Sequence, residues 1–71
     1  MDSKITMILE ILSDGKWHGM EELQQRMELD GHKVREITRF LGEYNFAEID
    51  DENRKVRINK GFQKFLAQTM I

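Results

Sequence analysis

The sequence predicts an α+β fold: a three-helix core with one short strand and a two-stranded hairpin, followed by a C-terminal helix. Apolar residues recur at helical spacing in three segments before residue 45 and in a fourth after residue 59. Between these segments, apolar and polar residues alternate with a period of two, as in strands. At 71 residues, with 39% hydrophobic and 34% charged side chains, the chain is expected to form one small domain over residues 1–71.

The first helix is expected at about residues 3–13. Ser3 is a suitable N-cap, and Asp14-Gly15 ends the helical pattern. One face carries the apolar residues Ile5, Ile8, Leu9 and Leu12.

A short strand at residues 16–18 would pair with the edge of the later hairpin and bury Trp17 as a core anchor. The second helix follows at about 19–28, with Gly19 as its N-cap and Met20, Leu23 and Met27 at helical spacing. Leu29 is expected to pack in the turn after this helix.

The third helix, at about 31–44, has two different faces. Asp30 can cap it by accepting a hydrogen bond from a backbone N–H near residue 33, and Asn45 can adopt the left-handed conformation that ends a helix. The expected core face consists of Val34, Ile37, Phe40, Leu41 and Tyr44, whereas the opposite face carries His32, Arg35, Glu36 and Arg39. One face therefore serves the fold and the other is available to a partner.

Residues 46–59 are expected to form the hairpin, with 51–54 as its loop. In this register Ile49 faces Val56 and Ala47 faces Ile58 on the inner side. On the outer side Glu48 faces Arg57 and Asp50 faces Lys55, so apolar and charged residues each meet suitable partners.

A C-terminal helix at about 60–70, capped by Asn59, carries an apolar stripe of Phe62, Phe65, Leu66, Thr69 and Met70. Two roles are open for this stripe. It can form a homodimer interface, or it can pack beside the first helix and complete the core.

The order of these elements resembles a winged helix-turn-helix domain of the kind found in small bacterial and archaeal transcriptional regulators. The segment ILEILSDGKWHGMEELQQRMEL is similar to the first helix, first strand and second helix of that family. DGHKVREITRFLGEYNFAEID with DENRKVRIN is similar to the recognition helix and the hairpin, or wing. Glu28 departs from the family pattern, since glycine is common at this turn and a left-handed conformation is costly for glutamate.

The resemblance implies sequence-specific binding of double-stranded DNA, with the third helix in the major groove and the wing on the backbone. Arg35 and Arg39 would contact guanine, Glu36 a cytosine amino group, and His32 and Lys33 phosphates. The alternative is a solvated helix face on which Glu36 neutralises Arg35 or Arg39, and for Glu36 this alternative is preferred. The expected DNA-binding residues are His32, Lys33, Arg35, Glu36, Arg39, Arg54 and Lys55.

Charge sets limits on this function. Residues 1–30 hold three Lys or Arg against seven Asp or Glu, whereas residues 31–71 hold eight against six, for a net charge of −2. In the wing, pairing with Asp50 and Glu48 would occupy Lys55 and Arg57 and leave Arg54 free. Few free cations imply weak binding by a monomer, which two copies on DNA would compensate.

The alternative is a winged helix used for protein–protein interaction without DNA, which the acidic first part would suit. No enzyme, cofactor or metal site is expected, because the chain has no cysteine and its two histidines have no recognisable ligand spacing. Both histidines are expected at the surface. The absence of cysteine fits a reducing compartment, and the N-terminus resembles neither a signal peptide nor a membrane span, so a cytoplasmic protein is expected.

Overall fold

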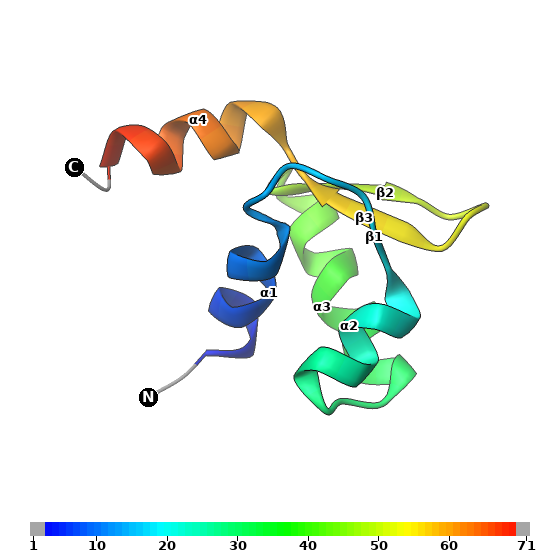
Figure 1. Cartoon of the computed structure of the whole chain (residues 1–71). Helices are drawn as coiled ribbons and strands as arrows, with labels where there is room; N and C mark the ends of the chain where they lie inside the picture. Colours follow the sequence, from blue (N-terminus) through cyan, green and yellow to red (C-terminus); the bar gives the residue numbers. More distant parts are fainter. Residues whose placement is uncertain (1–2, 70–71) are drawn as a thin grey trace.

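Four helices and a three-stranded antiparallel sheet make up residues 3–69, the part of the chain that the computed structural model describes (Figure 1). In chain order the elements are α1 (Lys4–Leu12), β1 (His18–Gly19), α2 (Met20–Met27), α3 (Gly31–Glu43), β2 (Ala47–Asp50), β3 (Lys55–Ile58) and α4 (Lys60–Thr69). The protein is therefore a small α+β domain with the predicted order of elements.

Side chains cap the N-termini of three helices, as predicted. Ser3 accepts a hydrogen bond from the Thr6 N–H at 3.4 Å, and Asp30 accepts one from the Lys33 N–H at 2.8 Å. Asn59 does the same for the Phe62 N–H at 3.0 Å. Each cap satisfies a backbone donor that the helix cannot satisfy itself, which fixes where α1, α3 and α4 begin.

Left-handed residues end two of the helices. Glu28, the C-cap of α2, has φ 55° and ψ 42°, and Asn45, just after α3, has φ 62°. The conformation costs a non-glycine residue about 1–2 kcal/mol, and asparagine tolerates it better than glutamate. At Glu28 the hydrogen bonds from the N–H groups of Glu28 and Leu29 to the Gln24 carbonyl support it. This turn brings α3 back beside α2.

The sheet has the order β1-β3-β2, and the predicted hairpin register is confirmed at all four pairs. Ala47 lies opposite Ile58, Glu48 opposite Arg57, Ile49 opposite Val56 and Asp50 opposite Lys55. The short strand β1 pairs with β3 at the other edge, where His18 lies opposite Val56. The pairing of β1 therefore ties the start of α2 to the hairpin.

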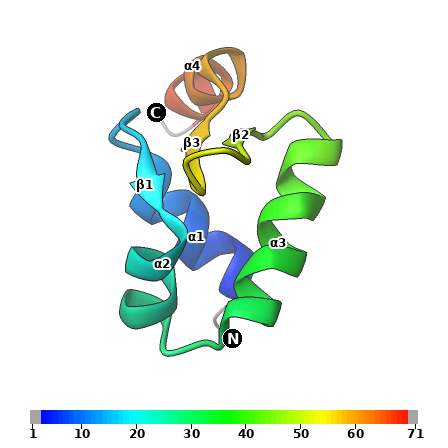
Figure 2. The same ribbon diagram turned by 90° about the vertical axis from the view of Figure 1, so that its right-hand side faces the viewer.

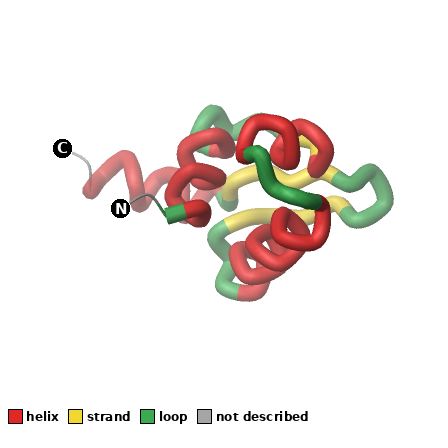
Figure 3. Tube along the Cα trace, turned by 90° about the horizontal axis from the view of Figure 1, so that it is seen from below, coloured by secondary structure: helices red, strands yellow, loops and turns green. Residues whose placement is uncertain are grey.

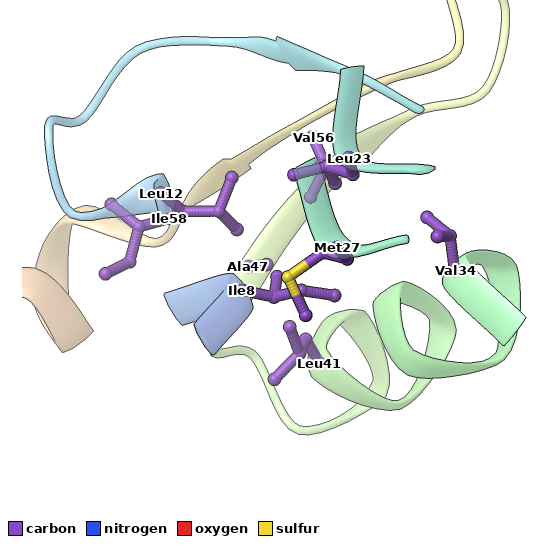
Figure 4. Close-up of a cluster of buried hydrophobic side chains, with 9 residues drawn as sticks. All are labelled: Ile8, Leu12, Leu23, Met27, Val34, Leu41, Ala47, Val56 and Ile58. Carbon is purple, nitrogen blue, oxygen red and sulfur yellow. The ribbon is translucent and has the colours of Figure 1, made fainter. Parts of the chain in front are cut away.

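The core lies where α1, α2, α3 and the inner face of the sheet meet (Figure 4). Its buried hydrophobic residues are Ile8, Leu12, Leu23, Met27, Val34, Leu41, Ala47, Val56 and Ile58. Thr38, rather than Phe40 or Tyr44, completes the buried face of α3, and Ile37 is half-buried. Phe40 and Tyr44 are 39% and 59% exposed, so their predicted place in the core is wrong.

Trp17 was predicted as a core anchor, and this is also wrong. Its side chain is 40% exposed, and the Arg57 guanidinium lies over the indole at 4.5 Å from the ring centroid. A two-residue strand at the sheet edge leaves the preceding residue at the surface. The indole therefore makes a cation–π contact instead of a core contact.

Helix α4 projects from the body of the domain, at the end opposite to the hairpin loop (Figure 3). Phe62 and Leu66 are half-buried against the core, and Gln63 donates a hydrogen bond to the Ser13 carbonyl at 2.8 Å. From Lys60 to Gln68, however, no side chain is fully buried, and Phe65 is 57% exposed. The packed part of α4 covers the edge of the core, and the Phe65 ring of its apolar stripe remains open to solvent.

Candidate functional site

A groove of about 800 Å³ lies between α2, α3 and the hairpin. The elements that line it can be followed in Figure 2, where α2 and α3 stand on opposite sides of the view and the hairpin lies above and between them. Its lining residues are Met20, Gln24, Gly31, Arg35, Arg39, Gly42, Glu43, Ala47, Ile49, Asp51 and Arg54. The lining thus combines apolar side chains from α2 and β2 with cations from α3 and the hairpin loop, and it includes the acidic residues Glu43 and Asp51.

Glycines let the walls of this groove approach closely. At Gly31 a Cβ atom would lie 3.0 Å from the Gln24 side-chain nitrogen, and at Gly42 it would lie 2.8 Å from the Ile49 Cδ1 atom. Because both residues lack a side chain, α3 can lie close to both α2 and β2, which makes the groove between them narrower.

Arg35 and Arg39 occupy successive turns of α3 and both line the groove. Both are exposed, and within residues 3–69 neither guanidinium has an acidic group within ion-pair distance. A guanidinium presents several N–H donors in a planar fork, which suits bidentate binding to a phosphate, a carboxylate or the O6 and N7 atoms of guanine.

Arg54, in the hairpin loop, was predicted to be free of ion pairs, and this is wrong. Its guanidinium lies 3.4 Å from the Glu21 carboxylate, and its carbonyl accepts a hydrogen bond from the Met20 N–H at 3.0 Å. The residue has φ 54°, a left-handed conformation that turns the chain into β3. The tip of the hairpin is therefore fastened to the first turn of α2.

Lys55 was predicted to be paired with Asp50, but its ammonium group is left without an ion pair in the described residues. It lies opposite Asp50 in the sheet, as predicted, but the Asp50 carboxylate accepts hydrogen bonds from the Asn53 side-chain amide at 2.8 Å and backbone N–H at 3.2 Å. These hydrogen bonds, with a smaller effect of the Lys55 charge, lower the pKa of Asp50. Within the described residues Lys55 makes no ion pair, so it is the hairpin cation available to a partner.

Arg57 pairs with Glu48 as expected, at 3.0 Å, and is further held by the indole of Trp17. It belongs to the outer face of the sheet and does not line the groove.

The remaining predicted contacts on α3 form a separate cluster. His32 Nε2 lies 2.8 Å from the Glu36 carboxylate, and the Lys33 ammonium lies 3.8 Å from it. All three side chains are more than half exposed, and none lines the groove. The structure thus brings Arg35, Arg39 and Arg54 together and leaves His32, Lys33 and Glu36 beside them on the helix.

A second polar cluster, missed from the sequence, surrounds His18. This histidine was predicted at the surface, but it is only 7% exposed. Its Nε2 atom lies 2.9 Å from Asp14, and its Nδ1 atom lies 2.9 Å from Glu22, which also accepts a hydrogen bond from Arg26 at 3.0 Å. The spacing of four residues on either side of His18 was the available signal, but it crosses a turn and a strand rather than one helix.

Ion pairing shifts the titration of this cluster. Burial alone would lower the pKa of His18, but its hydrogen bonds and charge interactions with Asp14 and Glu22 together raise it. The hydrogen bond with His18 is the main cause that lowers the pKa of Asp14 and also that of Glu22. The cluster therefore favours a charged imidazolium between two carboxylates.

Among residues 3–69, no group of three or more acidic or histidine side chains is arranged to hold a metal ion. Within the same residues, no helix combines the length and apolar character needed to cross a bilayer. Comparison with known proteins found no matching family model, no matching curated protein and no matching solved structure.

Proposed function

We propose that the protein is a winged helix-turn-helix regulator that binds double-stranded DNA, with α3 as the recognition helix and the β2–β3 hairpin as the wing. The observation that carries this proposal is the pair of arginines, Arg35 and Arg39, which have no ion-pair partner in the described chain and line the groove beside the hairpin. Helices that read DNA enter the major groove and contact base edges with such side chains.

The hairpin supplies the backbone contacts in this proposal. Lys55 is available at the start of β3, and Arg54 would exchange Glu21 for a phosphate when DNA arrives. Lys33 and His32, beside the groove at the start of α3, would meet the flanking phosphates. Glu36, held by these two residues, would orient them rather than contact a base.

The acidic groups nearby set the strength of binding. Glu43 and Asp51 line the groove together with the arginines, and Glu21 competes for Arg54. Because affinity for DNA grows with the number of phosphates neutralised, one copy of this chain would bind weakly. Two copies on adjacent half-sites would bind with much higher overall affinity.

We propose that α4 joins those two copies. Ten residues are too few for a stable isolated helix, so α4 gains from any surface that covers it. Its exposed ring Phe65 continues an aromatic row through Phe62 and Phe46 to Tyr44 and Phe40, with centroids 4.6–6.3 Å apart. Of the other stripe residues, Leu66 is half-buried, whereas Met70 and the Thr69 side chain lie outside the described part. Such a regulator would act in the cytoplasm.

The experiment that tests DNA binding directly on the protein surface is a chemical-shift map. A ¹⁵N-labelled sample is titrated with a short mixed-sequence duplex at low salt. The expected shifts concentrate on α3 and on residues 51–55, whereas amides of α1 move little. Shifts confined to other faces would contradict the assignment of α3, and a duplex that moves no signal would favour the protein-interaction alternative.

A further inference from the structure

The cluster around His18 joins three separate segments. Asp14 lies in the turn after α1, His18 begins β1, and Glu22 lies in the first turn of α2. On its other side, the same turn of α2 is fastened to the hairpin by the Met20 N–H, which donates to the Arg54 carbonyl, and by the Glu21–Arg54 ion pair. The cluster and the hairpin thus both hold the first turn of α2, which contributes Met20 to the groove.

The geometry of the ring requires a proton on each nitrogen. Both nitrogens of His18 face carboxylate oxygens at 2.9 Å, and carboxylates only accept hydrogen bonds. A neutral imidazole has one N–H group, so one of the two contacts would then place a nitrogen lone pair against an oxygen. Because the ring is buried, water has little access to replace the lost hydrogen bond.

No other charge takes over the role of the His18 proton. In the turn, the Lys16 backbone N–H donates a hydrogen bond to the Asp14 carboxylate at 2.9 Å. On α2, Arg26 is paired with Glu22, and Glu21 is paired with Arg54. On β3, the residue opposite His18 is the buried Val56, flanked by Lys55, opposite Gly19, and by Arg57, which is held by Glu48 and Trp17. Loss of the proton would leave one of the two carboxylates facing an unprotonated nitrogen of the buried ring.

We propose that Asp14, His18 and Glu22 form a proton-dependent clasp, which holds the start of α2 beside the hairpin and loosens when His18 loses its proton. The clasp would make the wall of the groove, and the fastening of Arg54 to α2, sensitive to pH. It concerns the fold itself and does not depend on what the groove binds.

The sign of the effect follows from the pKa shifts. The pKa of His18 is raised above the ordinary 6.5, so its contribution is complete below pH 6.5 and is lost as pH rises through the folded-state pKa. The pKa values of Asp14 and Glu22 are lowered, so their contribution is present above their ordinary values of 3.8 and 4.5 and is lost in more acidic solution. Stability from the clasp is therefore greatest between pH 4.5 and 6.5.

The first test follows the histidine ring signals by NMR, in the wild-type protein and in the His32→Gln variant. With His32→Gln, which removes the only other histidine, the remaining ring is expected to titrate clearly above 6.5 and to carry protons on both nitrogens at pH 6. A His18 ring that is neutral at pH 6, or that titrates at or below 6.5, would overturn the proposal. This measurement needs no substitution at His18 itself.

The second test measures how pH changes the stability of the hydrogen bond between the Met20 N–H at the start of α2 and the Arg54 carbonyl of the hairpin. The hydrogen-exchange protection factor of the Met20 amide is expected to fall about tenfold from pH 6 to pH 9, while that of Phe46, bonded to the Leu41 carbonyl, changes less. Over the same range the unfolding temperature should fall by about 5 °C in the wild type and in His32→Gln. In His18→Gln, which cannot acquire a proton, it should already be low at pH 6 and nearly constant. Parallel pH profiles for wild type and His18→Gln would exclude the clasp.

Discussion

Replacing Arg35 and Arg39 together by alanine is expected to lower the affinity for duplex DNA at least about 30-fold. A well-placed bidentate contact between arginine and a base is worth roughly 1–3 kcal/mol, so loss of two costs roughly 2–6 kcal/mol. Because both side chains are exposed and make no ion pair within residues 3–69, the unfolding temperature should remain nearly unchanged. Fluorescence anisotropy with a labelled duplex, together with thermal unfolding, measures both quantities.

The matched control for this double variant removes the same charge elsewhere. Lys4 and Lys64 are exposed, lie on α1 and α4 and do not line the groove. Their joint replacement by alanine changes the net charge equally, yet it should weaken duplex binding only a few-fold. Equal losses in the two double variants would show that binding depends on total charge rather than on the groove.

Phe65→Glu is expected to abolish self-association through α4. Burying a phenylalanine contributes about 1.5–3 kcal/mol, and a carboxylate in its place on an apolar interface is strongly unfavourable. Since Phe65 is 57% exposed, the domain itself should still fold. Sedimentation velocity at several concentrations should show a dimer for the wild type and a monomer for the variant.

Ala67→Glu is the control for the dimer, because this exposed residue lies about half a turn from Phe65 on the same helix. It introduces the same charge and should leave the dimer intact. A wild-type protein that sediments as a monomer at every concentration, or a Phe65→Glu variant that remains dimeric, would contradict the role of α4.

The parts of the fold that depend on local chemistry were predictable from the sequence. Caps such as Asp30 need only a side-chain oxygen three residues before a free N–H, and the confirmed hairpin register needs only two alternating patterns of matching polarity. The buried positions of α3 were less certain. Helical spacing alone could not show that Thr38 and Leu41 are buried whereas Phe40 and Tyr44 lie at the surface.

The electrostatic partners were harder to predict, because they depend on tertiary contacts. Arg54 meets Glu21 only because β1 pairs with β3 and places the hairpin tip beside α2. The Asp50 carboxylate accepts a hydrogen bond from the nearby side-chain amide of Asn53 instead of pairing with Lys55 on the opposite strand. This turn within the hairpin therefore leaves Lys55 without an ion pair in the described residues. To predict the burial of His18, one would need to know that a turn and a strand place two carboxylates on opposite sides of its ring.

The central claim, that the groove beside α3 binds duplex DNA, is tested most directly by the salt dependence of binding to a mixed-sequence duplex. Each phosphate that the protein neutralises contributes about −0.9 to the slope of log affinity against log salt concentration. With Lys33, Arg54 and Lys55 as the lysine and arginine side chains that meet phosphates, the expected slope is about −3 for each copy bound. Binding that is absent at low salt, or that does not change with salt, would contradict the claim.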